Sequence, residues 1–323
     1  MEVISTPKAN PETLLALIRN VYDGQVVIPR FQRPFVWKRE DIEEVLASIL
    51  QGYFIGTFLM LDTPAKKPMF PYTTVEGVKH IEGTTRPQEN ATVRLVLDGQ
   101  QRITSLFYAL YGPDIALKGS KYPHTFFLRL DYALAGDLDE AVIGVSTQNR
   151  RVMSEMKRLV DTDQAIPFTR MLDSGHFYQW LYSGQKSWQG QEQEQVKDLY
   201  DRFQKFMVPV IALSPETGKD NIVNIFERIN RTGVSLSLFD LAVAQLYLKG
   251  IKLRELWEQF ARKHEAVTSI VKPEFLLRLI ALVQDQEVRR RTLLNSLDAI
   301  RSLQINKIPV ILAGAERKYP SPG

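Results

Sequence analysis

The apolar run Val93-Arg94-Leu95-Val96-Leu97 is followed directly by the polar motif Asp98-Gly99-Gln100-Gln101-Arg102. Apolar residues then recur at helical spacing from Ile103 to Leu110, so the motif is predicted to join a buried strand to a helix. A helix start offers backbone N–H groups and the positive end of the helix dipole, which together attract anions. The motif therefore indicates a phosphate site.

A purely structural interpretation of the motif stays open. Asp-Gly is a common turn pair, and the Asp98 side chain could simply cap the following helix. A cap needs neither of the two glutamines nor Arg102, although Arg102 could pair with a structural carboxylate. The three residues after Gly99 therefore carry most of the functional signal.

Composition excludes several classes of site. The chain has 323 residues, 44% of them apolar, which is enough for a sizeable core and more than one subdomain. It has no cysteine, so disulfides, thiolate metal sites and a cysteine nucleophile are excluded. Its four histidines are far apart and do not form a zinc pattern. No segment has membrane-spanning length or signal-peptide character, so we expect a cytoplasmic protein without a membrane partner.

Positive charge is concentrated near the C-terminus. The net charge is +4, and residues 231–323 contain 15 Lys and Arg against 9 Asp and Glu. The cluster Arg289-Arg290-Arg291 lies in this part, and such a bias suits a polyanion partner. A solvated helix face is the alternative for so short a cluster.

The pattern of elements predicts an α+β fold followed by an α-helical bundle. Helices are expected at 11–22, starting at Asn10-Pro11, and at 42–50, ending at Gly52. Strands are expected at 26–28, 54–61, 93–97, 125–130 and 207–213, with a long loop or irregular hairpin at 62–92; Pro209 suits an edge strand or a bulge. The predicted domains are 1–235, with a helical insertion at about 131–206, and an α-helical subdomain at 236–323, where Ser237 and Asp240 fit a capping box.

Two further polar loops are candidate binding sites. The segment from Ile28 to Trp37 contains Arg30, Gln32 and Arg33 together with the aromatic residues Phe31, Phe35 and Trp37. Arginine and glutamine bind phosphates and base edges, and aromatic rings stack on bases, so this loop could bind DNA. Alternatively, the aromatic rings anchor the loop to the core.

The second loop follows a helix that is predicted to begin at Asn221 and to end at Asn230-Arg231-Thr232-Gly233. Arg228 and Asn230 lie close to the loop, and Gly233 stands where a left-handed cap or a close backbone approach is expected. A solvated helix face is the alternative for the earlier polar residues of this helix.

Four blocks, IPRFQRPFVW (28–37), GYFIGTFLML (52–61), LVLDGQQRITSL (95–106) and FERINRTGVSLS (226–237), occur in this order. Together they resemble the N-terminal domain of GmrSD-type modification-dependent restriction enzymes, a broad family that includes the phosphorothioate-sensing antiphage protein SspE. The resemblance covers about residues 25–240. It implies a ParB/sulfiredoxin-like fold, a small mixed sheet with helices, that binds and hydrolyses a nucleoside triphosphate such as GTP or ATP.

The resemblance also implies site residues and partners. Asp98, Gly99, Gln100, Gln101 and Arg102 would line the nucleotide site, joined by Gln32 and Arg33 and by the loop residues Arg228, Asn230 and Gly233. DNA carrying a phosphorothioate or a modified base would be the partner, and an HNH-type nuclease, C-terminal or separate, would cut it. The present sequence lacks a histidine-rich ββα pattern, so we do not expect this chain alone to cleave DNA.

Two functional hypotheses follow. In the first, Asp98 holds Mg²⁺ or orients water, Gln101 orients water, and Arg102 with Arg33 stabilises the charge on the transferred phosphoryl group. The protein is then a nucleoside triphosphatase that senses modified DNA in antiviral defence. In the second, it is a non-catalytic DNA-binding module in which Arg30, Phe31, Phe35 and Trp37, together with the basic C-terminal bundle, contact modified DNA.

Overall fold

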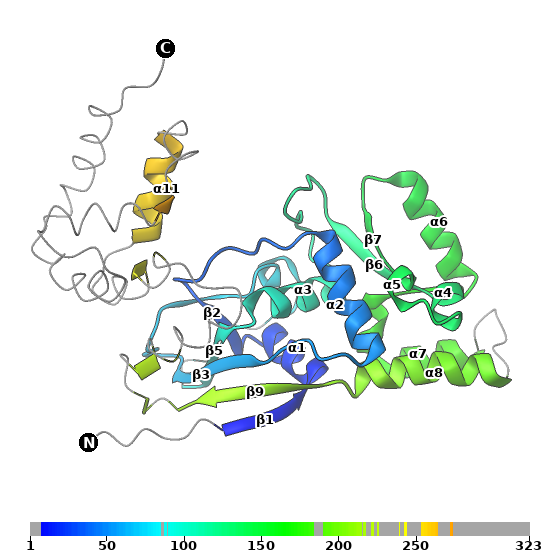
Figure 1. The fold of residues 1–323 in the computed structure, drawn as a ribbon, viewed down its shortest axis with the longest axis horizontal. Helices are drawn as coiled ribbons and strands as arrows, with labels where there is room; N and C mark the ends of the chain where they lie inside the picture. The colour runs from blue at the N-terminus through cyan, green and yellow to red at the C-terminus, as the bar shows by residue number, and fades with distance from the viewer. Residues whose placement is uncertain are drawn as a thin grey trace, which may run out of the picture. The chain divides into compact units, whose positions relative to one another are not determined.

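A computed structural model describes residues 8–84, 87–88, 90–183, 190–214, 216–217, 221–222, 225, 239, 242–243, 253–263 and 272–273. The chain divides into two compact units. The first comprises residues 1–30 and 34–218, and the second comprises residues 31–33 and 219–323. The described part of the chain is a mixed α/β structure (Figure 1).

A six-stranded mixed sheet forms the centre of the first unit, with the strand order β1-β9-β3-β5-β2-β4. Its strands are β1 (Lys8–Thr13), β2 (Val26–Pro29), β3 (Phe58–Pro64), β4 (Tyr72–Thr74), β5 (Thr92–Asp98) and β9 (Met207–Leu213). The β2–β5 and β3–β9 pairs are parallel, and the other pairs are antiparallel. The expected mixed sheet is therefore present; the ParB/sulfiredoxin-like topology and the C-terminal bundle stay predictions.

Three helices bury their apolar sides in one continuous core with this sheet (Figure 1). They are α1 (Leu14–Tyr22), α2 (Arg39–Gln51) and α3 (Gln100–Tyr111). The predicted end of α2 is confirmed, because Gly52 adopts the left-handed conformation at its C-terminus. The predicted junction between β5 and α3 is also confirmed.

A smaller sheet of three strands, in the order β7-β6-β8, adds to the first unit. It comprises β6 (His124–Arg129), β7 (Val142–Ser146) and β8 (Ala165–Pro167). Around the two sheets lie η1 (Val78–His80), α4 (Leu130–Leu134), α5 (Leu138–Ala141), α6 (Arg150–Asp161), η2 (Phe168–Leu172), α7 (Ser174–Ser183) and α8 (Gly190–Gln204). Segment 131–206 is rich in helix as expected, but the sequence analysis missed β7 and β8 within it.

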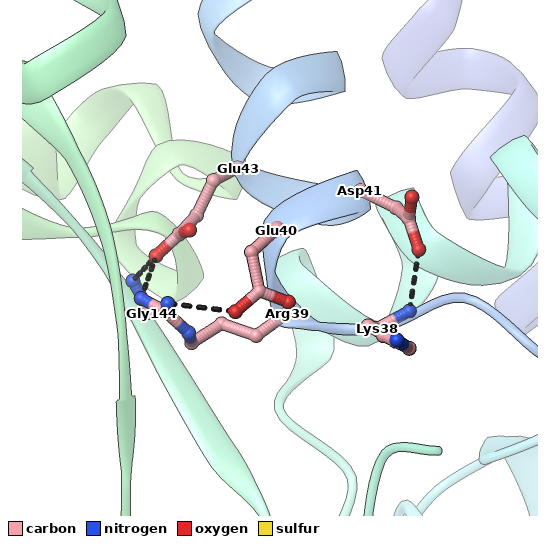
Figure 2. A network of polar contacts seen from close by, with 6 residues as sticks. All are labelled: Lys38, Arg39, Glu40, Asp41, Glu43 and Gly144. Atoms are coloured by element: carbon pink, nitrogen blue, oxygen red, sulfur yellow. Dashed lines mark hydrogen bonds and ion pairs between the residues drawn. The ribbon is translucent and has the colours of Figure 1, made fainter. Parts of the chain in front are cut away.

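A polar network links α2 to the smaller sheet (Figure 2). The Glu43 carboxylate accepts hydrogen bonds from the Gly144 N–H at 2.6 Å and from the Arg39 guanidinium at 2.8 Å. Asp41 accepts the Lys38 N–H at 2.7 Å and so caps the start of α2. A Cβ at Gly144 would lie 2.6 Å from the Phe126 ring of β6 and 2.8 Å from Cγ of Arg39 in α2, so a larger residue would collide with both.

Two details of the predicted element order are wrong. Residues 8–13 form a strand that pairs with β9, and α1 begins only at Leu14, where the Thr13 hydroxyl accepts the Ala16 N–H at 3.3 Å. Pro209 lies in β9, an internal strand. The sheet accommodates it because its partner in β1 is Pro11, which also lacks an N–H, and because pairing with β3 begins only at Val210.

The second unit is described at few positions. Helix α11 (Leu253–Lys263) is its one described regular element. Arg254 donates a hydrogen bond to the Phe31 carbonyl at 3.0 Å and lies 5.9 Å from the centre of the Phe239 ring. The predicted capping box at Ser237 and Asp240 and the cluster Arg289–Arg291 lie outside the described residues.

Candidate functional site

The Asp98–Arg102 motif lies at an edge of the large sheet where three chain segments meet. Because β2 and β5 are parallel neighbours, their carboxyl ends lie at the same edge. Strand β3 is antiparallel to β5 and starts at this edge, with Leu59 opposite Asp98. The loop before β3 and the segment leading into α2 therefore both approach the motif.

Gly99 makes the sharp turn from β5 into α3. Its φ is +95°, and a Cβ would lie 2.5 Å from the Phe58 ring, so the position requires glycine. Gly99 has no side chain to cap α3, and the Ile103 N–H makes the first helical hydrogen bond, to the Gly99 carbonyl at 3.0 Å. The N–H groups of Gln101 and Arg102 thus lie outside the hydrogen-bond ladder of the helix, as an anion site requires.

Gln101 holds the segment that leads into α2. Its side-chain oxygen accepts the Val36 N–H at 2.9 Å, and its amide nitrogen donates to the Pro34 carbonyl at 3.1 Å. The residue is only 7% exposed. The side-chain amide therefore both accepts from and donates to the backbone, as a neighbouring strand would.

Arg102 holds the loop before β3. Its guanidinium donates to the carbonyls of Ile55 at 2.6 Å and Thr57 at 2.9 Å, and it pairs with Asp98 at 3.3 Å. It also lies 4.9 Å from the centre of the Phe58 ring. Burial lowers the pKa of Arg102, and the nearby Asp98 charge acts in the opposite direction. The cation is thus fixed beside the start of α3.

Asp98 is the exposed carboxylate of the motif, with 37% of its side chain accessible. The chain offers no group of three or more metal-binding side chains within its described ranges. A single carboxylate still fits Mg²⁺, which is commonly held by one or two carboxylates together with substrate phosphates and water. The assignment of Mg²⁺ to Asp98 therefore stays a prediction.

The aromatic residues of the 28–37 loop are largely used for packing. Phe31 is 3% exposed, and Phe35 and Trp37 pack against the main core while remaining half-buried. Arg30 is exposed and donates to the Tyr72 carbonyl at 3.2 Å. The packing of Phe35 and Trp37 fits the anchoring interpretation, and DNA binding by Arg30, Phe31, Phe35 and Trp37 stays a prediction.

The role of the remaining predicted nucleotide ligands stays a prediction. Gln32 and Arg33 are half-buried members of the second unit and have interaction partners of their own. Gln100 is half-buried at the start of α3. Arg228, Asn230 and Gly233 lie outside the described residues.

Sequence analysis missed the loop that Arg102 holds. The expected strand at 54–61 starts only at Phe58, and Tyr53 and Phe54 are 61% and 75% exposed. The available signal was Gly56, whose φ is +95° and whose absent side chain leaves room for Arg102. A glycine inside an apolar run often marks such a close approach.

Comparison with known proteins identifies the family. Residues 13–247 match the model of the GmrSD restriction endonuclease N-terminal domain, so the chain belongs to this family. The resemblance found in the four sequence blocks is thereby confirmed.

One relative is an uncharacterized protein, MJ0686, from Methanocaldococcus jannaschii. The two sequences are 34% identical over 307 residues, which cover 88% of this chain and 50% of the relative. The chain thus spans about half the length of this relative. Among the described residues, no helix is long and apolar enough to cross a membrane.

Proposed function

We propose that this chain is the nucleoside-triphosphate-binding and hydrolysing sensor domain of a modification-dependent restriction system, in which DNA recognition is coupled to nucleotide turnover. The observation that carries the proposal is the exposed Asp98 carboxylate at the uncapped start of α3, with the Arg102 cation fixed 3.3 Å away. Family membership supports the link to restriction.

The site residues divide into two groups by their contacts. The N–H groups of Gln101 and Arg102 and the Asp98 carboxylate are available to bind phosphate and its metal ion. Mg²⁺ would neutralise charge on the phosphates when bound. Arg102 adds a fixed positive charge, and its Nε–H makes no hydrogen bond within the described part of the chain.

Gln101 is better suited to positioning than to orienting water, because both the oxygen and the nitrogen of its side-chain amide bind the 34–36 backbone. We retain Gln32, Arg33, Gln100, Arg228, Asn230 and Gly233 as proposed nucleotide contacts on the strength of the family resemblance. An HNH-type nuclease, in the same protein or a separate one, is the proposed partner for cleavage.

The test is phosphate release from GTP and from ATP with Mg²⁺, with and without DNA. Asp98→Ala should abolish release and keep the wild-type circular dichroism spectrum. Asp114→Ala, which removes an exposed carboxylate without a hydrogen bond to any described residue, should leave release unchanged. Undiminished release by the Asp98 variant would refute the catalytic assignment.

A non-catalytic DNA-binding module is the second candidate. This candidate is favoured because the Arg102 guanidinium already donates three hydrogen bonds within the protein and so has fewer donors left for a phosphate. Wild-type protein that released no phosphate under any of these conditions, yet bound modified duplex more tightly than plain duplex, would support this module.

A further inference from the structure

Helix α6 has an apolar side and a strongly basic side. Five apolar residues face the smaller sheet and join its core, namely Val152, Met153, Met156, Leu159 and Val160. Four cations are exposed on the outer side, namely Arg150, Arg151, Lys157 and Arg158. An amphipathic basic helix can lie on a membrane, but only if its apolar side is free to enter the lipid. In α6 that side is already covered by Phe127 and Val145.

The four cations form two pairs on the exposed side of the helix. Arg150 and Arg151 stand seven residues before Lys157 and Arg158, so the pairs are about two turns, or roughly 10.5 Å, apart along the axis. Ser154 is exposed between them. Duplex DNA carries one phosphate charge per about 1.7 Å of its axis, so the same length of duplex contains about six phosphates on its two strands together.

The charges of this side are not used within the protein. None of the four cationic side chains forms an ion pair or hydrogen bond with any residue that the structure describes. Glu155 and Asp161 are the carboxylates of the helix, which leaves an excess of two positive charges on α6. Three of the four cations are arginines, whose planar guanidinium suits phosphate oxygens.

We propose that the outer side of α6, formed by Arg150, Arg151, Ser154, Lys157 and Arg158, binds the phosphate backbone of duplex DNA. The choice of DNA as the polyanion rests on the proposed function. Helix α6 packs on the smaller sheet (Figure 1), whereas the Asp98 motif lies at the end of a strand of the larger one. This α6 surface contributes affinity independently of base sequence and base modification, because phosphate contacts carry no base information.

The test is fluorescence anisotropy of the full chain with a plain 20-base-pair duplex over a series of NaCl concentrations. The slope of log affinity against log salt is negative, and each lost phosphate contact makes it less steep by about one. Arg150→Gln with Arg151→Gln should therefore weaken binding and make the slope less steep by about two. Lys157→Gln with Arg158→Gln should act similarly.

The matched control is Lys118→Gln with Lys121→Gln, which removes the same charge from an exposed loop without ion pairs to described residues. The control should change the slope by less than one. Equal effects of the control and the α6 pair, no effect of either α6 pair, or no binding by the wild type would overturn the proposal. Binding of phosphatidylserine vesicles that the α6 changes abolish, with DNA binding intact, would also overturn it.

Phosphate release without DNA separates this proposal from the proposed function. The α6 variants should hydrolyse nucleotide at the wild-type rate, since their substitutions lie outside the motif. Normal hydrolysis with an unchanged salt slope would reject the α6 surface alone. Absent hydrolysis in the wild type, with the expected loss of slope in the variants, would reject the nucleotidase and keep the α6 surface.

Discussion

The Arg102 guanidinium occupies the space that any side chain on Gly56 would need. A Cβ at Gly56 would lie 2.1 Å from Arg102 Nη1, and Gly56 has a φ of +95°. The carbonyls on either side of Gly56, those of Ile55 and Thr57, accept the Arg102 hydrogen bonds. The motif and the loop before β3 are therefore built around each other.

Gly56→Ala should destabilise the first unit, because the new methyl group displaces Arg102 and strains a backbone that favours glycine. We expect a loss of about 1–3 kcal/mol from the backbone strain, with the collision adding to it. Urea unfolding followed by circular dichroism measures the loss.

Gly52→Ala is the matched control for that substitution. Gly52 has a φ of +75°, but a Cβ there would meet nothing within 4 Å. It should therefore show the strain alone and a smaller loss. Equal losses for the two variants would mean that the Arg102 contact contributes nothing.

Gln101→Met should release the segment before α2. The substitution keeps the volume of the side chain but removes the acceptor of the Val36 N–H and the donor to the Pro34 carbonyl. Hydrogen exchange at the Val36 amide should accelerate. The Arg30 amide, which donates to the Pro71 carbonyl at 2.9 Å, serves as an internal control and should keep its rate. Faster exchange at both amides would instead indicate general unfolding.

The buried Glu43 carboxyl should make stability depend on pH. Burial raises its pKa, and the hydrogen bond from Gly144 and the Arg39 charge only partly oppose this. The folded state then holds the proton more tightly than the unfolded state. The contribution of Glu43 to stability is therefore greatest below the ordinary pKa of 4.5 and decreases as the pH rises through the raised pKa.

Glu43→Gln tests this dependence because it keeps an acceptor for the Gly144 N–H and removes the charge (Figure 2). The free energy of unfolding of the wild type, relative to the variant, should fall as the pH is raised from 4 to 7. A difference that stayed constant or grew over this interval would contradict the role of burial.

Asp201 should contribute stability with the opposite pH dependence. The Tyr178 hydroxyl donates to it at 2.7 Å, and Lys197 and Lys205 lie 3.1 Å away. These groups, the tyrosine first, lower its pKa from 3.8 to about 2. The stabilisation is complete above the unfolded pKa and is lost as the pH falls towards 2; it amounts to about 2 kcal/mol at most.

Asp201→Asn should therefore cost more stability at pH 6 than at pH 3 in urea unfolding experiments. Asp198→Asn, an exposed change in the same helix α8, provides the comparison and should show no such trend. If both variants lost the same stability at the two pH values, the Tyr178 and lysine contacts would not explain the low pKa.

Local patterns predicted much of the large sheet. Leu95, Val96 and Leu97 are apolar at consecutive positions and all three are buried in β5, and the pairing of β5 with β2 and β3 was not needed to recognise the strand. Gly52 was identified as a helix end because its left-handed conformation is a local property. The strand at residues 8–13 was not identified, because Pro11 at a helix start is locally favourable and only pairing with β9 overrides it.

The sequence by itself determined the family, from four blocks that occur in order, and the strand-to-helix junction at Asp98, because the change from an apolar run to helical spacing is a local pattern. The tertiary structure alone decided what Gln101 and Arg102 hold. Their partners, the backbones at 34–36 and 55–57, are 45 to 67 residues away along the chain. The sheet brings those segments to one edge, and a backbone carbonyl or amide leaves no mark in the sequence.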